Sequence, residues 1–437
     1  MTRRLLVPAL CLLAAIASIA CPAADKRPAA GTSRGVDWPG WRGANRDGLS
    51  DESGLLDRWT GDGPRLVWKA GHLGRGFSSI SIADGRIFTM GDREGAQFVI
   101  ALDLATGKEL WSTSIGDVWE PNGYAGPRGT PTVDGAYLYV LGPHGDLVCL
   151  QTARGKEVWR RNVHRDFGGR MHSGWGYSES PLVDGDKLVS TPGGADAGIV
   201  ALDKRTGREL WRSAIPALGP LGGDGAAYSS IVTSNGAGVR QYVQLMGRGV
   251  VGVDAGTGKF LWGYNRVANG TANIPTPLAS GDYVFCSSGY QAGAALLKLT
   301  PAAGGGVHAE EVYFLDGKEF QNHHGGMIML GDYIYAAHGH NAGAPTCLEW
   351  MTGKTVWRHN RGPGTGSAAV AYADGNLYFR FQNGLMALVA ATPDEYREKG
   401  TFKIPDVDEP SWSHPVIAGG KLYLREQDAL YCYDVKQ

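Results

Sequence analysis

The chain has 437 residues with a formal net charge of −1; 43% of its residues are hydrophobic and 19% are charged. This balance is typical of a soluble globular protein with a large core, and it excludes a disordered chain. The near-neutral charge provides no overall field for attracting nucleic acid or an anionic membrane, so we expect no nucleic-acid partner.

The first residues have the layout of a secretory leader. Two arginines precede an apolar run that ends at Ala20, and this run is shorter than a membrane span requires. We therefore predict a signal peptide over residues 1–20, with residue 24 as the alternative end, and a periplasmic or secreted protein without a membrane span. Because a cysteine follows the predicted cleavage site, an outer-membrane lipoprotein anchored through Cys21 is the alternative.

Residues 21–64 form an extension that precedes the first repeat. It contains DWPGWRGANRDG, whose Trp38 and Trp41 we expect to pack across the rest of the chain as a cap or clasp.

One phrase recurs along the chain: an apolar run, a Thr-Gly-Lys type turn and a short run that closes on an aromatic residue. It reads ALDLATGKELW at 101–111 and ALDKRTGRELW at 201–211. The closing residues follow one another at intervals of 43 to 52 residues, which is typical of four-stranded propeller blades; they are Trp68, Trp111, Trp159, Trp211, Trp262, Tyr313, Trp357 and Phe402. Because the tryptophans recur at one blade position, we expect them to dock neighbouring blades rather than bind a ligand.

A second phrase alternates with the first and predicts a hairpin in every blade. Examples are GTPTVDGAYLYVLG and SAAVAYADGNLYFR, in which an Asp-Gly pair separates two β-rich runs. Each blade then has strands A and B from this phrase and strands C and D from the phrase that closes on the aromatic residue.

The two ends of the repeat region complement each other. RLVWKA, which begins at residue 65, is an outer strand with nothing before it, while the C-terminal HPVIAGGKLYLREQDALYCYD supplies three strands and no fourth. Joining them closes the ring and leaves no open sheet edge at the junction. The sequence thus predicts an all-β fold over residues 65–437: an eight-bladed β-propeller of four-stranded antiparallel blades.

The phrases have the form A-x-D-x-x-T-G-x-x-x-W and resemble the tryptophan-docking repeats of PQQ-type quinoprotein propellers. Within that superfamily the chain is similar to secreted bacterial PQQ-binding-like β-propeller repeat proteins, which are grouped with BamB-type outer-membrane assembly lipoproteins. The resemblance implies the fold and leaves the activity open. The chain contains neither the vicinal Cys-Cys pair nor the CxxCH haem site of quinoprotein dehydrogenases. We therefore expect no cofactor, with PQQ and calcium as the alternative.

Propeller topology places the candidate ligand site on one face. Because neighbouring strands are antiparallel, the D-to-A connections and the B-to-C loops leave the blades on the same side. These connections carry the polar and aromatic residues that ligand sites use. The predicted ligand-binding face comprises Arg128, Trp175, Tyr177, Glu179, Tyr228, Arg248, Asn273, Gln291, His323, His324, His338, His340, Gln382, Trp412 and His414.

Two further hypotheses concern this face. His324, His338 and His340 lie at the same end of one blade and are candidate metal ligands, although a role in orienting a ligand is favoured. Glu179 is the candidate general acid or base, although a structural carboxylate is favoured.

The four cysteines beyond the leader are Cys149, Cys286, Cys347 and Cys432, and each lies in an apolar stretch. We predict buried thiols, with two disulfides as the alternative.

Taken together, these features favour an exported, non-catalytic and monomeric propeller of the cell envelope that binds a protein or a small ligand through its loop-rich face. The alternatives are a PQQ- or metal-dependent oxidoreductase acting on alcohols or sugars, and a carbohydrate-binding module.

Overall fold

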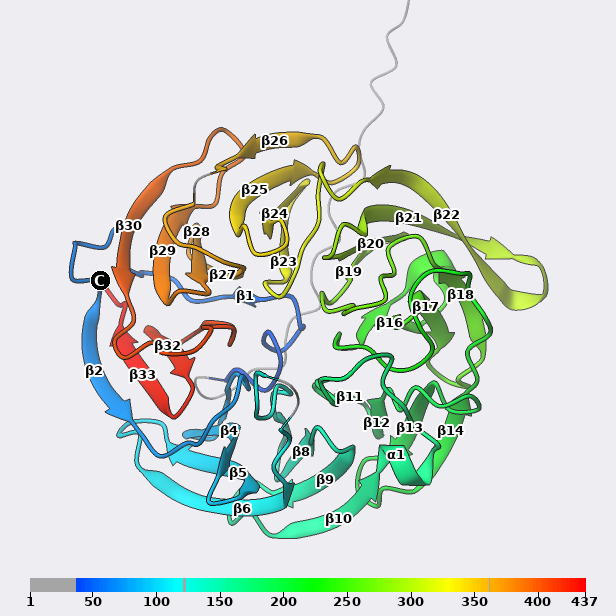
Figure 1. Ribbon diagram of the computed structural model, residues 1–437, viewed down its shortest axis with the longest axis horizontal. Coiled ribbons are helices and arrows are strands. Elements are labelled where there is room, and N and C mark those ends of the chain that lie inside the picture. The colour runs from blue at the N-terminus through cyan, green and yellow to red at the C-terminus, as the bar shows by residue number, and fades with distance from the viewer. Residues whose placement is uncertain (1–36, 121–122, 361) are drawn as a thin grey trace, which may run out of the picture. The chain divides into compact units, whose positions relative to one another are not determined.

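The computed structural model describes residues 37–120, 123–360 and 362–437; the predicted signal peptide and Cys21 lie outside these residues. The described residues form eight sheets arranged in a ring, each containing four antiparallel strands, which confirms the predicted β-propeller (Figure 1). In each sheet the first strand of the repeat lies nearest the centre and the last lies on the outside.

Each blade contains the predicted strands A to D in chain order. The first four blades are β3–β6 (Ser81–Ala83, Arg86–Arg93, Ala96–Asp103, Glu109–Asp117), β7–β10 (Thr132–Asp134, Tyr137–Leu141, Asp146–Gln151, Glu157–Asn162), β11–β14 (Leu182–Asp184, Lys187–Ser190, Ile199–Asp203, Glu209–Ser213) and β15–β18 (Val232–Ser234, Gln241–Met246, Gly249–Asp254, Phe260–Tyr264). The next three are β19–β22 (Leu278–Ser280, Tyr283–Ser288, Gly293–Ala302, Gly306–Leu315), β23–β26 (Met327–Leu330, Tyr333–His338, Ala344–Glu349, Thr355–Arg358) and β27–β30 (Ala368–Ala373, Asn376–Phe381, Leu385–Ala390, Glu398–Lys403). Short helical turns lie outside the sheets: α1 (Val163–Asp166) and two 3-10 segments (Gly236–Gly238, Ala303–Gly305).

The eighth blade closes the ring as predicted. Its inner strands are β31 (Val416–Ala418), β32 (Lys421–Glu426) and β33 (Ala429–Asp434), and its outer strand is β2 (Arg65–Ala70). β2 pairs antiparallel with β33, with Leu66 opposite Tyr433 and Ala70 opposite Leu430. The two ends of the repeat region therefore share one sheet, which removes the open edge that separate ends would leave.

The phrase that closes on tryptophan has a physical basis in the turn before it. Asp103 Oδ1 accepts hydrogen bonds from the Thr106 backbone N–H at 2.9 Å and from Thr106 Oγ1 at 2.6 Å. The same pair of bonds joins Asp203 to Thr206 and Asp254 to Thr257. The Asp and Thr thus fix the turn, and the glycine that follows supplies the positive φ.

Six of the eight closing aromatic residues cover a turn glycine of the next blade, whereas Trp262 and Trp357 do not. Trp111 lies over Gly155, whose φ is +66°, so closely that a Cβ added there would be 2.5 Å from the ring. The Trp111 indole N–H also donates to the Thr152 carbonyl of that blade at 3.0 Å. Trp159 makes the same contacts with Gly207 and Lys204 one blade further on. We call this set of contacts the docking rim.

Residues 38–50 of the N-terminal extension lie at the centre of the ring. Trp38 pairs with Ile82 of the first blade, and β1 (Leu49–Ser50) runs parallel to β27 of the seventh (Figure 1). Between them, the buried Arg46 donates to the Ser180 and Pro181 carbonyls of the third blade. We call residues 38–50 the plug; the segment expected to lie across the propeller as a clasp therefore lies inside it.

All four cysteines beyond the leader are buried and free, as predicted. Each lies within a strand, and burial raises the pKa of the Cys149, Cys347 and Cys432 thiols to about 12. Thiols of this kind are part of the core and are poor nucleophiles.

Candidate functional site

A cavity of about 350 Å³ is formed where the connections between blades meet above the plug. Its volume is within the range of small-molecule sites. It is lined by Trp41, Phe77, Tyr124, Arg128, Trp175, Ser178, Ser180, Tyr228, Ser230, Ala272, Ile274, Pro275, Thr276, Tyr290, His323, His324, Gly326, His340, Asn341, Gln382, Trp412 and His414.

Most of these residues come from the D-to-A connections. The β6–β7 connection supplies Arg128, the β10–β11 connection Trp175 and the β30–β31 connection Trp412. The B-to-C loops of the fifth, sixth and seventh blades contribute as well, for example His340 from the β24–β25 loop. The plug adds Trp41, whose indole N–H donates to Thr276 Oγ1 at 3.2 Å.

Four histidines form one wall of the cavity. The rings of His323 and His324 stack with centroids 3.5 Å apart, and the ring of His340 lies 4.2 Å from that of His323. His414 reaches the same cluster because its Nε2 is 3.1 Å from the His324 carbonyl, to which it donates. The sequence placed these residues on one face, and the structure brings them into contact.

The histidine cluster is neutral at pH 7. Burial lowers the pKa of His323 to about 3 and that of His414 to about 3, and it lowers the pKa of His324 and His340 as well. Neighbouring imidazoles and arginines act in the same direction. Neutral imidazoles donate and accept hydrogen bonds, so this wall can orient a ligand without attracting charge.

Arg128 is the one lining residue with a permanent charge among the described residues. Its guanidinium donates to the Gly126 carbonyl at 3.2 Å, to the Trp175 carbonyl at 3.0 Å and to the Tyr124 carbonyl, and it lies over the Phe77 ring. No described carboxylate lies within ion-pair distance of it, and burial lowers its pKa to about 10. The cavity therefore has positive character at this point.

Six residues of the predicted face lie outside the cavity lining and support it or lie apart from it. Tyr177 is buried and donates to the Pro192 carbonyl, while Asn273 is buried and donates to the Met246 and Gly247 carbonyls. Arg248 forms an ion pair with Asp224. The remaining three are Glu179, Gln291 and His338.

Gln291 and His338 lie beside the cavity. Gln291 is exposed, and its backbone N–H donates to Gln321 Oε1 at 2.9 Å. His338 accepts a hydrogen bond from the Gln321 backbone N–H and lies against the Phe320 ring, so it is separate from the four clustered histidines. Its orientation could not be read from its position at the end of a strand.

Glu179 is a buried part of the third blade. Its carboxylate accepts from the Thr191 backbone N–H at 2.7 Å, from Thr191 Oγ1 at 2.9 Å and from Ser190 Oγ at 3.0 Å. Burial raises its pKa to about 7 although these hydrogen bonds act in the opposite direction. Its neighbours Ser178 and Ser180 line the cavity, whereas the carboxylate is directed into the blade.

The donor set of the cavity can be compared with what a metal or a quinone with calcium requires. Among the described residues, no group of three or more His, Cys, Asp or Glu side chains is arranged to hold a metal ion. Calcium prefers carboxylate and carbonyl oxygens, yet the lining residues include no Asp or Glu. The described residues therefore do not fit calcium-assisted PQQ binding in this cavity.

Sequence reasoning missed several lining residues. Phe77, Tyr124, Tyr290 and the plug residue Trp41 contribute aromatic surface to the cavity. Tyr290 precedes the predicted Gln291 and has a φ of +58°, which turns its side chain toward His340 at 4.2 Å between ring centroids. A signal existed, because each of these residues except Trp41 lies in a connection already assigned to the loop-rich face.

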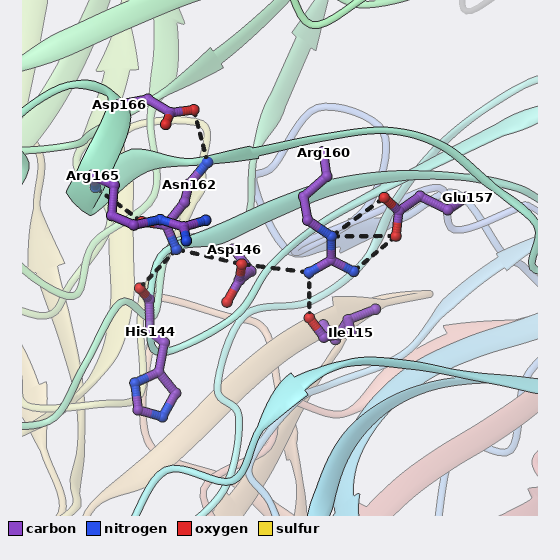
Figure 2. Close-up of polar contacts among 8 residues, drawn as sticks. All are labelled: Ile115, His144, Asp146, Glu157, Arg160, Asn162, Arg165 and Asp166. Atoms are coloured by element: carbon purple, nitrogen blue, oxygen red, sulfur yellow. Dashed lines mark hydrogen bonds and ion pairs between the residues drawn. The ribbon is translucent and has the colours of Figure 1, made fainter.

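Polar groups on β9, β10 and the β8–β9 loop of the second blade serve a structural purpose. Figure 2 shows Asn162 beside α1, where its side chain accepts from the Arg165 backbone N–H and donates to the His144 carbonyl. Arg160 joins Glu157 and Asp146 to the neighbouring blade through the Ile115 carbonyl (Figure 2). This cluster braces two blades and lies apart from the cavity lining.

The fold and its repeats define a PQQ-like β-propeller repeat protein. Residues 95–359 match the family described as outer membrane protein assembly factor BamB, and the chain belongs to this family.

Curated relatives with that name match parts of the chain. The protein from Shewanella oneidensis is 22% identical over 228 residues, which cover 52% of each chain. The protein from Burkholderia pseudomallei is 26% identical over 162 residues, which cover 37% of this chain and 36% of the relative. The chain therefore spans about half or less of the length of these relatives.

Solved structures share the fold at low identity. BamB from Moraxella catarrhalis superposes with a TM-score of 0.59 at 14% identity, covering 85% of this chain and 98% of that one. Quinohemoprotein alcohol dehydrogenase from Comamonas testosteroni gives 0.61 at 13% identity, covering 92% and 80%. At this identity the likeness concerns the fold alone.

In the part of the chain that the structure describes, no helix is both long enough and apolar enough to cross a membrane.

Proposed function

We propose that this protein is an exported, non-catalytic binding protein of the cell envelope whose recognition site is the cavity on its loop-rich face. The observation that carries this proposal is the convergence of connections from different blades, together with Trp41 of the plug, on one aromatic and polar cavity. Concave sites with apolar walls and a few fixed polar groups are typical of ligand binding. The match to an assembly-factor family and the leader-like N-terminus favour the envelope as its location.

The proposal includes a monomer, held in the periplasm or anchored at the outer membrane through Cys21. It expects no cofactor, because the lining lacks the carboxylates that would hold calcium beside a quinone. The carbohydrate alternative gains support from Trp175 and Trp412, which line the cavity, while the buried Tyr177 does not contribute. An envelope protein could dock on the loops around the same cavity.

Site-specific photo-crosslinking in cells tests the proposal. A benzoylphenylalanine at Tyr124, which is 45% exposed and lines the cavity, should form adducts whose mass on the tryptic peptide distinguishes a small ligand from a protein. The matched control is a benzoylphenylalanine that replaces Arg205 instead. Arg205 is exposed in a Thr-Gly turn of the opposite face. Adducts that form equally or only at position 205 would contradict the loop-rich face as the recognition surface.

A second measurement tests the non-catalytic part. The purified protein is titrated with PQQ and Ca²⁺ and assayed for dye-linked alcohol oxidation. We expect no turnover; saturable binding of PQQ that requires Ca²⁺, together with turnover, would replace this proposal with the oxidoreductase.

A further inference from the structure

The cavity has one fixed charge and no described counter-charge. Arg128 lines it, while the described residues that line it include no Asp, Glu or Lys. Asp92 attracts Arg128 from outside the lining and beyond ion-pair distance. Arg128 is half-buried and hydrogen-bonded to neutral carbonyls rather than to a carboxylate, so an anion that enters the cavity would gain a preformed, charge-assisted contact.

The Arg128 guanidinium is held in place and keeps N–H groups that can bind a ligand. The three carbonyls of Tyr124, Gly126 and Trp175 take three of its five N–H groups, and two remain. Carbonyls also hold Arg46 in the plug, so such contacts alone can position an arginine. Arg128 differs because it borders open space, where a planar carboxylate matches the fork of two N–H groups.

Unpartnered nitrogens in the histidine wall provide an independent observation. The Nδ1 atoms of His324 and His340 are buried and have no hydrogen-bond partner in the described structure. Both residues line the cavity. Buried polar atoms without partners are rare in folded proteins, and a polar molecule bound at this wall would supply the partners that these two nitrogens lack.

The remaining surface is flat and aromatic. Trp412 lies between Phe77 and Tyr124, with ring centroids 4.8 Å and 4.7 Å away, and Trp175 lies 5.9 Å from Tyr228. Aromatic faces such as these accept another ring, whether an aromatic ring or the apolar face of a sugar.

We propose that the cavity takes a small organic acid whose carboxylate binds Arg128, whose polar substituents meet His324 and His340, and whose ring lies against the tryptophans. This inference deepens the proposed function and rests on it. The neutral state of the histidines leaves Arg128 as the sole charge among the described lining residues that a carboxylate would meet.

Calorimetric titration with matched acid and neutral probes tests the inference. One pair is 2-naphthoate and 2-naphthamide, and the other is glucuronate and glucose, so that the two pairs distinguish an aromatic ring from a sugar ring. We expect one acid to bind at least about 30-fold more tightly than its neutral partner, as is typical of a desolvated charge pair. The acid preference is measured on the unaltered protein and depends on no variant.

Variants then assign the preference to Arg128. Arg128→Gln should abolish it, and Arg128→Lys, which keeps the charge and loses the fork, should weaken acid binding by about 10-fold. Arg248→Gln is the matched control, because Arg248 lies on the same face, outside the lining and paired with Asp224. Circular dichroism checks that each variant is folded.

Two results would overturn the inference: no preference for either acid in the unaltered protein, or a preference that survives in folded Arg128→Gln or Arg128→Lys at full strength. In that case adducts at position 124 in cells would still support the proposed function. Adducts absent at 124, with acid binding present, would instead contradict the proposed role and leave the ligand chemistry standing.

Discussion

The docking rim and the cavity differ in how they use the repeat. In the rim the same contact returns from blade to blade, as when Trp111 covers Gly155 and Trp159 covers Gly207. In the cavity each connection contributes a different side chain, such as Arg128 from one and Trp412 from another. The repeated contacts thus stabilise the fold, whereas the side chains that differ between blades form the candidate site.

The role of the repeated rim contact is tested most strongly by replacing a rim glycine. Gly155→Ala should lower the free energy of unfolding by about 3 kcal/mol, since the added Cβ meets the Trp111 ring and the positive φ of +66° is strained. Chemical denaturation measures the change.

Gly135 provides the control for backbone strain. It has a φ of +56° in a hairpin turn, and a Cβ there would meet nothing within 4 Å. Gly135→Ala should therefore cost only about 1 kcal/mol. Equal losses at the two glycines would show that the aromatic contact is not what requires glycine in the rim.

The rim could be predicted from sequence because its causes are local. Asp103, Thr106 and Gly107 form their turn within one short stretch, and the closing Trp111 follows directly. The ring closure was equally accessible, because counting strands left one blade shared by the two ends. Even so, a bulge directly precedes most of the closing aromatic residues, as between Glu109 and Trp111, and the sequence alone did not indicate it. In the seventh blade the bulge lies between Glu398 and Gly400 instead.

The cavity could be predicted only in part because its causes are distant. Trp41 meets Thr276, a partner 235 residues away, and nothing near Trp41 in the chain indicates that contact. The position of His338 at a strand end did not reveal that its side chain faces Gln321. Topology therefore gave the correct face of the blade, while the direction of each side chain required the structure.

The buried histidines of the cavity predict that the stability of the protein depends on pH. His414 has a folded pKa of about 3 because of burial and of the nearby Arg42 and Arg380, against an ordinary value of 6.5. Below pH 6.5 the unfolded chain takes up a proton that the folded protein does not, so stability is lost as the pH falls from about 6.5 toward 3. At pH 5 this one residue should cost about 2 kcal/mol relative to pH 8.

Replacing His414 measures that contribution. His414→Gln should make the dependence of unfolding free energy on pH shallower between pH 7 and 5, by about one proton. His308→Gln is the control, because His308 is exposed on the β21–β22 hairpin away from the cavity. Burial raises the pKa of the Glu179 carboxyl instead. The contribution of Glu179 to stability therefore falls as the pH rises from about 4.5 to 7. An unchanged slope in His414→Gln would show that folding does not lower the pKa of His414.

The smallest expected effect separates the two functions of a rim tryptophan. Trp111 covers a glycine and donates its N–H to the Thr152 carbonyl, whereas the Trp211 N–H is buried without a partner although its ring covers Gly258. Phenylalanine at either position loses similar ring area, but only Trp111→Phe loses a hydrogen bond. We expect Trp111→Phe to be less stable than Trp211→Phe by about 1 kcal/mol, measured by chemical denaturation of both variants. Equal losses would mean that ring coverage alone holds neighbouring blades together, and the rim would then tolerate any large flat side chain.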